Sequence, residues 1–227
     1  MSATPPPKQK NIGRSMLRNS LALALFALLT AAILATTESI TEPRIVAAER
    51  AAEQRALLEL VPATMHDNDM LADTYPIPEQ HWPLLGLNKG GVAHLASRDG
   101  KPVAVILPAV SKSGYSGDIS MIIGLTPSGE LLGVRVTSHR ETPGLGDKVE
   151  LKKSPWILSF NGQSLAKLAR SEWTVKKDGG AFEQFTGATI TPRAVIGQVL
   201  AGLDYFALER AALLAAAQPN ALENRDE

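Results

Sequence analysis

Hydroxyl side chains gather in one short stretch near the end of the chain. The sequence EQFTGATITPRAV, residues 183–195, places Thr186, Thr189 and Thr191 directly before an apolar run with helical spacing. Pro192 suits the first turn of that helix because its missing N–H is not needed there, which makes Thr191 the expected N-cap. A hydroxyl at the positive end of a helix dipole lies among unpaired N–H groups, where phosphate binds well. The stretch therefore predicts an anion site, although many helices carry a threonine N-cap and bind nothing.

Small residues beside these hydroxyls favour a large ligand. Gly187 and Ala188 carry almost no side chain, so something large and flat could approach the backbone closely. The predicted helix N-terminus and these small residues together indicate that the stretch binds a ligand. They do not indicate acid–base chemistry.

Two further glycine-containing stretches could meet a polar ligand. SKSGYSGDI, residues 111–119, has glycines on both sides of Tyr115 and suits a tight loop at the mouth of a sheet. HRETPGLGDK, residues 139–148, follows a predicted strand and combines backbone N–H groups with the carboxylate of Glu141. Each stretch could equally be an ordinary turn at a strand end.

Other chemistries find little support. Gly144 and Gly146 lack the third glycine and the βαβ context of a dinucleotide-binding fingerprint. Ser138 and His139 are neighbours in a predicted strand, so their side chains point to opposite faces and a hydrolytic triad with Asp147 is not expected. We therefore expect neither catalytic side chains nor a metal site.

Composition narrows the function further. The 227 residues contain 23 Lys and Arg against 23 Asp and Glu, so no charge excess points to nucleic acid as a partner. The absence of cysteine excludes disulfides, thiolate nucleophiles and cysteine-ligated iron–sulfur clusters held by this chain. Any redox role would need an organic cofactor.

An apolar segment near the N-terminus precedes the part of the chain that contains these stretches. No charge occurs from Leu21 to Thr37, and residues 19–37 would form roughly 28 Å of helix, close to the thickness of a hydrocarbon core. The preceding charges are all basic (Lys8, Lys10, Arg14 and Arg18), so the N-terminus is expected in the cytoplasm and the rest beyond the membrane. An uncleaved anchor fits the long run better than a cleaved signal peptide, which remains the alternative.

A stalk, a linker and a sheet are expected to follow. Residues 44–60 are rich in helix formers and predict a stalk helix, whereas residues 68–91 mix Pro, Gly and polar residues and predict irregular structure. A β-rich run covers 102–110, and 118–139 predicts a hairpin that turns at Thr126–Gly129. Its second arm alternates, with Leu132, Val134 and Val136 expected on one face.

Two helices complete the prediction. A helix is plausible over 164–173, and a firmer one runs from Pro192 past Leu208 because its apolar residues recur at three- and four-residue spacing. The fold class is therefore α+β: a transmembrane helix and stalk helix, then one domain with an antiparallel sheet and flanking helices.

The motifs resemble those of a known family. TGATIT, residues 186–191, looks like the signature at which a flavin transferase attaches FMN to the last threonine through a phosphodiester bond. ETPGLGDK at 141–148 and GYSGDI at 114–119 are similar to the other two hallmarks of FMN-binding domains. Their order, with one N-terminal membrane helix, most resembles the G subunits of Rnf (also called Rsx) ion-translocating electron transport complexes. The C subunits of sodium-pumping NADH:quinone reductases are related.

The resemblance implies a site and a cofactor. Thr191 would bear one covalent FMN per chain. The remaining cofactor-binding residues implied by it are Thr186, Gly187, Ala188, Thr189, Glu141, Thr142, Pro143, Gly144, Leu145 and Tyr115. The family signature usually begins with Asp where this chain has Glu183, and we expect attachment to tolerate the extra methylene.

It also implies a function, partners and a location. The chain would be an electron-carrying translocase subunit in the inner membrane, with its main domain in the periplasm, other complex subunits as partners and a flavin transferase for maturation. The expected organisation is a cytoplasmic N-terminus (1–18), a transmembrane helix (19–37), a stalk and linker (38–85), the FMN-binding domain (86–215) and a tail (216–227). The alternatives are a flavin-free scaffold with the same fold and a soluble flavoprotein released by signal cleavage.

Overall fold

The computed structural model describes residues 12–218 of the chain. Residues 1–11 of the expected cytoplasmic segment (1–18) and residues 219–227 of the expected tail (216–227) lie outside the described residues. The chain divides into two compact units, Met1–Ala52 and Glu53–Glu227.

The described part of the first unit is helical. Helix α1 (Ile12–Leu60) joins the expected membrane helix and stalk helix without a break, and Pro43 lies inside it. The part from Ser15 to Arg44 has a mean hydropathy of 2.1 and is, by length and composition, able to cross a membrane. Threonine hydroxyls within it donate to backbone carbonyls four residues earlier, as Thr36 does to Ala32 at 2.6 Å, so they remain satisfied in an apolar surrounding.

The second unit is built on one antiparallel sheet. Its five strands are hydrogen-bonded in chain order: β1 (Thr74–Pro76), β2 (Val92–Arg98), β3 (Lys101–Ser111), β4 (Ile119–Leu125) and β5 (Leu131–Ser138). The expected strand over 102–110 and the hairpin are therefore confirmed, and the Gly129 N–H closes the turn on the Thr126 carbonyl at 2.9 Å. The sequence reasoning missed β1 and β2.

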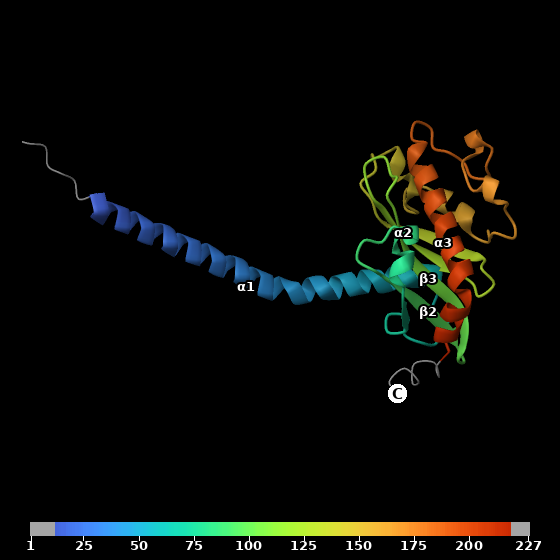
Figure 1. Cartoon of the computed structure of the whole chain (residues 1–227), viewed down its shortest axis with the longest axis horizontal. Coiled ribbons are helices and arrows are strands. Elements are labelled where there is room, and N and C mark those ends of the chain that lie inside the picture. The colour runs from blue at the N-terminus through green and yellow to red at the C-terminus, as the bar shows by residue number, and fades with distance from the viewer. Residues whose placement is uncertain (1–11, 219–227) are drawn as a thin grey trace, which may run out of the picture. The chain divides into compact units, whose positions relative to one another are not determined.

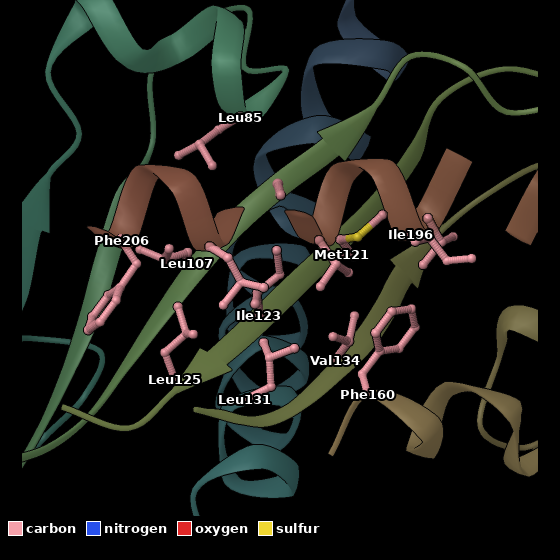
Figure 2. Close-up of a cluster of buried hydrophobic side chains, with 14 of the residues drawn as sticks. Leu85, Leu107, Met121, Ile123, Leu125, Leu131, Val134, Phe160, Ile196 and Phe206 are labelled. Carbon is pink, nitrogen blue, oxygen red and sulfur yellow. The ribbon is translucent and has the colours of Figure 1, made fainter. Parts of the chain in front are cut away.

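Different helices pack on the two faces of the sheet. On one face, Leu107 of β3 pairs in register with Ile123 of β4, and both pack in the main core with Ile196 and Phe206 of helix α3 (Ile190–Ala216). Figure 2 shows these side chains between the strands and α3. Alternate residues such as Ile106 face the other way and pack with Leu57 and Leu60 from the last turns of α1.

A bulge changes one predicted face. The register of β4 and β5 shifts where Leu125 pairs with Leu131 and Gly124 pairs with Gly133, which leaves Leu132 without a partner between them. Leu132 therefore packs with the α1 side of the sheet, whereas Val134 packs in the main core and Val136 against it. The expectation that all three residues share one face was wrong for Leu132.

The segment between β5 and α3 is irregular and gathers beside the first turns of α3 (Figure 1). The expected helix over 164–173 was wrong: the chain forms a turn at Ser164–Leu168 and a short 3-10 helix, Arg170–Glu172. Extended backbone at Ala169 interrupts the pattern, which lets Trp173 enter the core. Other short helices are η1 (Glu79–His81), α2 (Trp82–Leu85), η2 (Gly146–Val149), η3 (Pro155–Phe160) and η5 (Lys176–Asp178).

Aromatic side chains fix this irregular segment. Trp156 lies edge-on to Phe160 and Phe185 with ring centroids 5.4 and 5.0 Å apart. The Trp156 indole N–H also donates to the Glu183 carbonyl at 2.7 Å. The chain leading into α3 is thus attached to the core three residues before Thr186.

Candidate functional site

A cavity of about 310 Å³ opens at the start of α3. Three separate stretches supply its wall: the loop before β4, the loop after β5, and the turn that leads into α3. The lining residues are Tyr115, Glu141, Thr142, Leu145, Gly146, Gly187, Ala188, Thr189, Ile190 and Thr191. Eight of the eleven residues singled out from the sequence belong to this wall, whereas Pro143, Gly144 and Thr186 lie in the same loops but outside it.

Thr191 differs from its predicted role. The N-cap of α3 is Thr189, so Thr191 is the second helical residue, and the Thr189 side chain makes no capping hydrogen bond. Thr191 is only 1% exposed, and its hydroxyl donates to the Glu141 carboxylate. Pro192 is still tolerated because every position in the first helical turn lacks an intrahelical partner for its N–H. Helix α3 therefore begins two residues before the predicted start at Pro192, and its cap was misplaced by the same two residues.

The Glu141 carboxylate is held from several sides. It is 4% exposed, and its second oxygen accepts the backbone N–H of Ser116 at 2.8 Å. Its own backbone N–H donates to His139 Nδ1 at 3.0 Å, and Nε2 of that ring lies 2.7 Å from Glu150. The carboxylate therefore ties the loop before β4 to the first turn of α3.

Gly146 is a site residue that the sequence reasoning did not select. A Cβ atom there would lie 2.9 Å from the Thr191 hydroxyl oxygen and 2.8 Å from the Glu141 Cβ, closer than ordinary contacts allow. Only glycine lets the loop backbone approach this pair so closely. Its sequence signal was the second glycine of PGLG, residues 143–146, which we weighed as part of a dinucleotide fingerprint and not as a close approach of the backbone.

The turn before α3 leaves room beside Thr191. Gly187 adopts a φ of 81°, a conformation that side chains rarely accept, and its Cα faces Leu145. Ile190, a second lining residue that was not selected, is 46% exposed, and Tyr115 is 69% exposed. The wall therefore combines small and apolar groups with three threonines, the Tyr115 phenol and one carboxylate.

The positive potential that the first turn of α3 offers to an anion comes from its backbone N–H groups, and the Glu141 carboxylate beside Thr191 opposes it. Arg193 also lies in the first turn, but its guanidinium binds both oxygens of Asp178 at 2.6 and 2.8 Å. This hydrogen bonding raises the pKa of Arg193 and lowers the pKa of Asp178. Because that cation is already paired, an anion at Thr191 would rely on the unpaired N–H groups and dipole of the helix.

The residues considered for hydrolysis have other partners. Both ring nitrogens of His139 are engaged, and Asp147 lies 3.8 Å from Lys153. Within residues 12–218, no group of three or more His, Cys, Asp or Glu side chains could hold a metal ion.

The part of the chain that carries the cavity matches a known class of protein. Residues 114–204 match the FMN-binding domain family, and this range contains every residue of the cavity wall. Residues 1–60 match the family described as the RnfG N-terminal region.

Relatives specify the family. The chain is 50% identical over 202 residues to the G subunit of the ion-translocating oxidoreductase complex of Pseudomonas aeruginosa, covering 89% of this chain and 94% of that protein. The corresponding G subunits of Shewanella loihica (44%; 88% and 94% covered) and Vibrio cholerae (41%; 83% and 88% covered) are similar over nearly the same length. The chain belongs to this family of G subunits of ion-translocating oxidoreductase complexes, and it is a membrane-anchored protein with an FMN-binding domain.

The residues of the cavity fit FMN. The first turn of α3 offers N–H groups and the Thr191 hydroxyl to a phosphate. Gly187 and Ala188 leave the backbone open to a flat ring, and Leu145 and Ile190 offer apolar contacts beside it. A cavity of this size is at the lower end of the range for small-ligand sites.

Proposed function

We propose that this protein carries electrons on one FMN attached covalently to Thr191 through a phosphodiester bond, as part of a cation-translocating complex. Thr191 carries this proposal because it is the one threonine of the TGATIT stretch that combines a place in the cavity wall, a position inside the first turn of α3 and a hydrogen bond to a buried carboxylate. Thr189 also lines the cavity, but its side chain makes no capping bond, and Thr186 lies outside the wall.

The protein residues bind and position the cofactor, while FMN, once bound, supplies the electron transfer. Thr191 and the helix N-terminus would hold the phosphate, and Gly187 and Ala188 would admit the ring. Leu145, Ile190 and Tyr115 would shield part of the ring from water. The absence of cysteine is consistent with a protein in which flavin alone carries electrons.

The proposed organisation follows the sequence boundaries. Residues 1–18 would be cytoplasmic, 19–37 would span the membrane, 38–85 would form the stalk and linker, and 86–215 would bind FMN in the periplasm, followed by a tail at 216–227. The basic residues before the apolar segment and the absence of acidic ones there support this orientation. A covalent link suits such a location, because a cofactor lost outside the cytoplasm is not easily replaced.

Covalent flavin is tested directly in the full chain. After co-expression with a flavin transferase, the denatured wild-type protein is expected to keep flavin fluorescence on a gel and to gain the mass of one FMN phosphoester. Thr191→Ala is expected to lose both signals. Thr137→Ala, which removes an exposed hydroxyl near the end of β5, is the matched control and is expected to keep them.

Two outcomes would contradict the proposal. A wild-type chain without covalent flavin under these conditions would favour a flavin-free scaffold of the complex. A Thr191→Ala chain that still carries the adduct would move the attachment to another residue, which peptide mass mapping across residues 183–195 would identify.

A further inference from the structure

Thr191 and Glu141 form a buried pair that could take part in a reaction as well as bind a cofactor. The hydroxyl, on a residue 1% exposed, donates its proton to a carboxylate that is itself 4% exposed. An alcohol is a weak nucleophile until an adjacent base takes its proton, and a directly hydrogen-bonded carboxylate is such a base. The pair therefore has the geometry of an activated nucleophile.

The base is held in place independently of the hydroxyl. The Ser116 N–H binds the other carboxylate oxygen at 2.8 Å, and the His139 ring accepts the Glu141 backbone N–H at 3.0 Å. These contacts come from loops on both sides of the hairpin β4–β5, so the carboxylate oxygen that accepts from Thr191 has a fixed direction. Rotation of the Glu141 side chain away from Thr191 would break the bond to Ser116 as well.

No other ionisable side chain of the cavity wall is placed to act as the base in place of Glu141. Among the described residues that line the cavity, only Glu141 and Tyr115 have ionisable side chains, and Tyr115 is largely exposed. Asp147 is buried in the next turn, and its Oδ1 has no hydrogen-bond partner, but it does not belong to the wall. The backbone of Gly146 packs directly against Thr191 and Glu141 and leaves no room for a side chain beside them.

We propose that Glu141 is the general base of flavin attachment, so that the acceptor chain supplies both the nucleophile and its proton acceptor. This inference rests on the proposed attachment at Thr191. The donor is a flavin mononucleotidyl group activated as a phosphoanhydride and presented by the transferase. A bond forms between the Thr191 hydroxyl oxygen and the phosphorus, the anhydride P–O bond breaks, and the leaving phosphate departs with its electron pair. The hydroxyl proton passes to the Glu141 carboxylate, and nothing is oxidised or reduced.

The experiment follows the rate of attachment rather than electron transfer. Full-length unmodified chain in detergent is mixed with purified transferase and its flavin donor, and covalent flavin is followed over time by gel fluorescence and intact mass. Glu141→Gln keeps the size of the side chain but removes the base, and it is expected to slow attachment by about 10²–10⁴-fold. Glu141→Asp keeps the charge on a shorter side chain and is expected to react at an intermediate rate.

A matched control separates the base from a general effect of buried charge. Asp147→Asn neutralises a carboxylate of similar burial that lies near Lys153 and lies outside the cavity wall, and it is expected to react at the wild-type rate. Formate added to Glu141→Ala is expected to restore part of the rate, because a small carboxylate can occupy the vacated space. A purely structural role for Glu141 would give no formate rescue.

The outcomes distinguish the two proposals. If Glu141→Gln reacts within threefold of wild type while Thr191→Ala remains unmodified, the base is wrong and the attachment site stands. If Thr191→Ala is modified, the proposed attachment fails first. If Glu141→Gln melts at a lower temperature than wild type, formate decides: rescue of Glu141→Ala supports the base, and an unrescued but folded variant overturns it.

Discussion

Replacement of Gly146 by alanine tests the close packing at the centre of the site. The added Cβ would lie 2.8 Å from the Glu141 Cβ, 2.9 Å from the Thr191 hydroxyl oxygen and 3.0 Å from a Glu141 carboxylate oxygen. Ordinary carbon contacts lie near 3.5–4.0 Å, so each neighbour has to move by roughly half an ångström or more. Neither neighbour is free to do so, because both side chains are buried and Glu141 is bonded to Ser116.

The expected cost is that of overpacking a well-filled interior. Such insertions cost about 1–3 kcal/mol, which for a domain of this size lowers the melting temperature by about 2–12 °C. Because the displaced atoms include the Thr191 hydroxyl, covalent flavin attachment is expected to slow in the same variant.

The assay pairs thermal unfolding of the unmodified full chain with the rate of flavin attachment. Gly197→Ala is the matched control, since a Cβ there meets nothing within 4 Å and Gly197 lies inside α3. That substitution is expected to stabilise the domain by about 0.5–1 kcal/mol. A Gly146→Ala chain that melts with wild type and accepts flavin at the wild-type rate would refute the close approach of the loop to Thr191.

Three further predictions concern the core and its caps. Gly202→Ala places a Cβ 2.5 Å from Ile123 Cδ1 and is expected to lower the unfolding free energy in urea by about 1–3 kcal/mol, whereas an unchanged midpoint would contradict the tight packing of α3 on β4. Ser154→Ala removes the hydroxyl that accepts the backbone N–H of Trp156 at 3.2 Å, and urea titration is expected to find a loss of about 1 kcal/mol. Burial, with Glu209 nearby, raises the pKa of Tyr205 above its ordinary value of about 10. The folded state therefore keeps that proton longer than the unfolded state, so stability is complete below about pH 10 and declines as the pH rises further. Tyr205→Phe, which also removes a buried hydroxyl without a partner, is expected to flatten this decline, and an unchanged pH profile would argue against it.

The sequence predicted those parts of the fold that depend on local patterns. The hairpin β4–β5 was visible in its turn residues, and α3 in its apolar spacing. In contrast, β2 has five consecutive buried residues, so it lacks the alternation that marks a strand with one exposed face. The helix expected at 164–173 does not form, because Trp173 is buried in the core. Its tertiary packing outweighs the modest helical propensity of the segment.

In the site too, features with a local sequence pattern were predicted and those that depend on tertiary contacts were not. Motif resemblance brought together loops that do line one cavity, and the small residues beside Thr191 were recognisable as a space for a ligand. The partnership of Thr191 with Glu141 joins residues fifty positions apart, and no local pattern encodes it. The cap assignment failed because α3 already begins at Ile190, so the Thr191 hydroxyl lies inside the helix and donates to that distant carboxylate.

The bond between Thr191 and Glu141 also sets a condition on the mature protein. A phosphodiester at Thr191 would remove the hydroxyl proton that Glu141 now accepts and would place a negatively charged phosphoryl group beside the carboxylate. Two like charges 4 Å apart repel by about 4 kcal/mol at an effective dielectric constant of 20. The Glu141 carboxylate would then turn away from Thr191 and release Ser116. The unmodified and flavin-bearing chains would therefore differ in the loop before β4, and cofactor loading would be readable in the protein itself, in the amide signals of that loop.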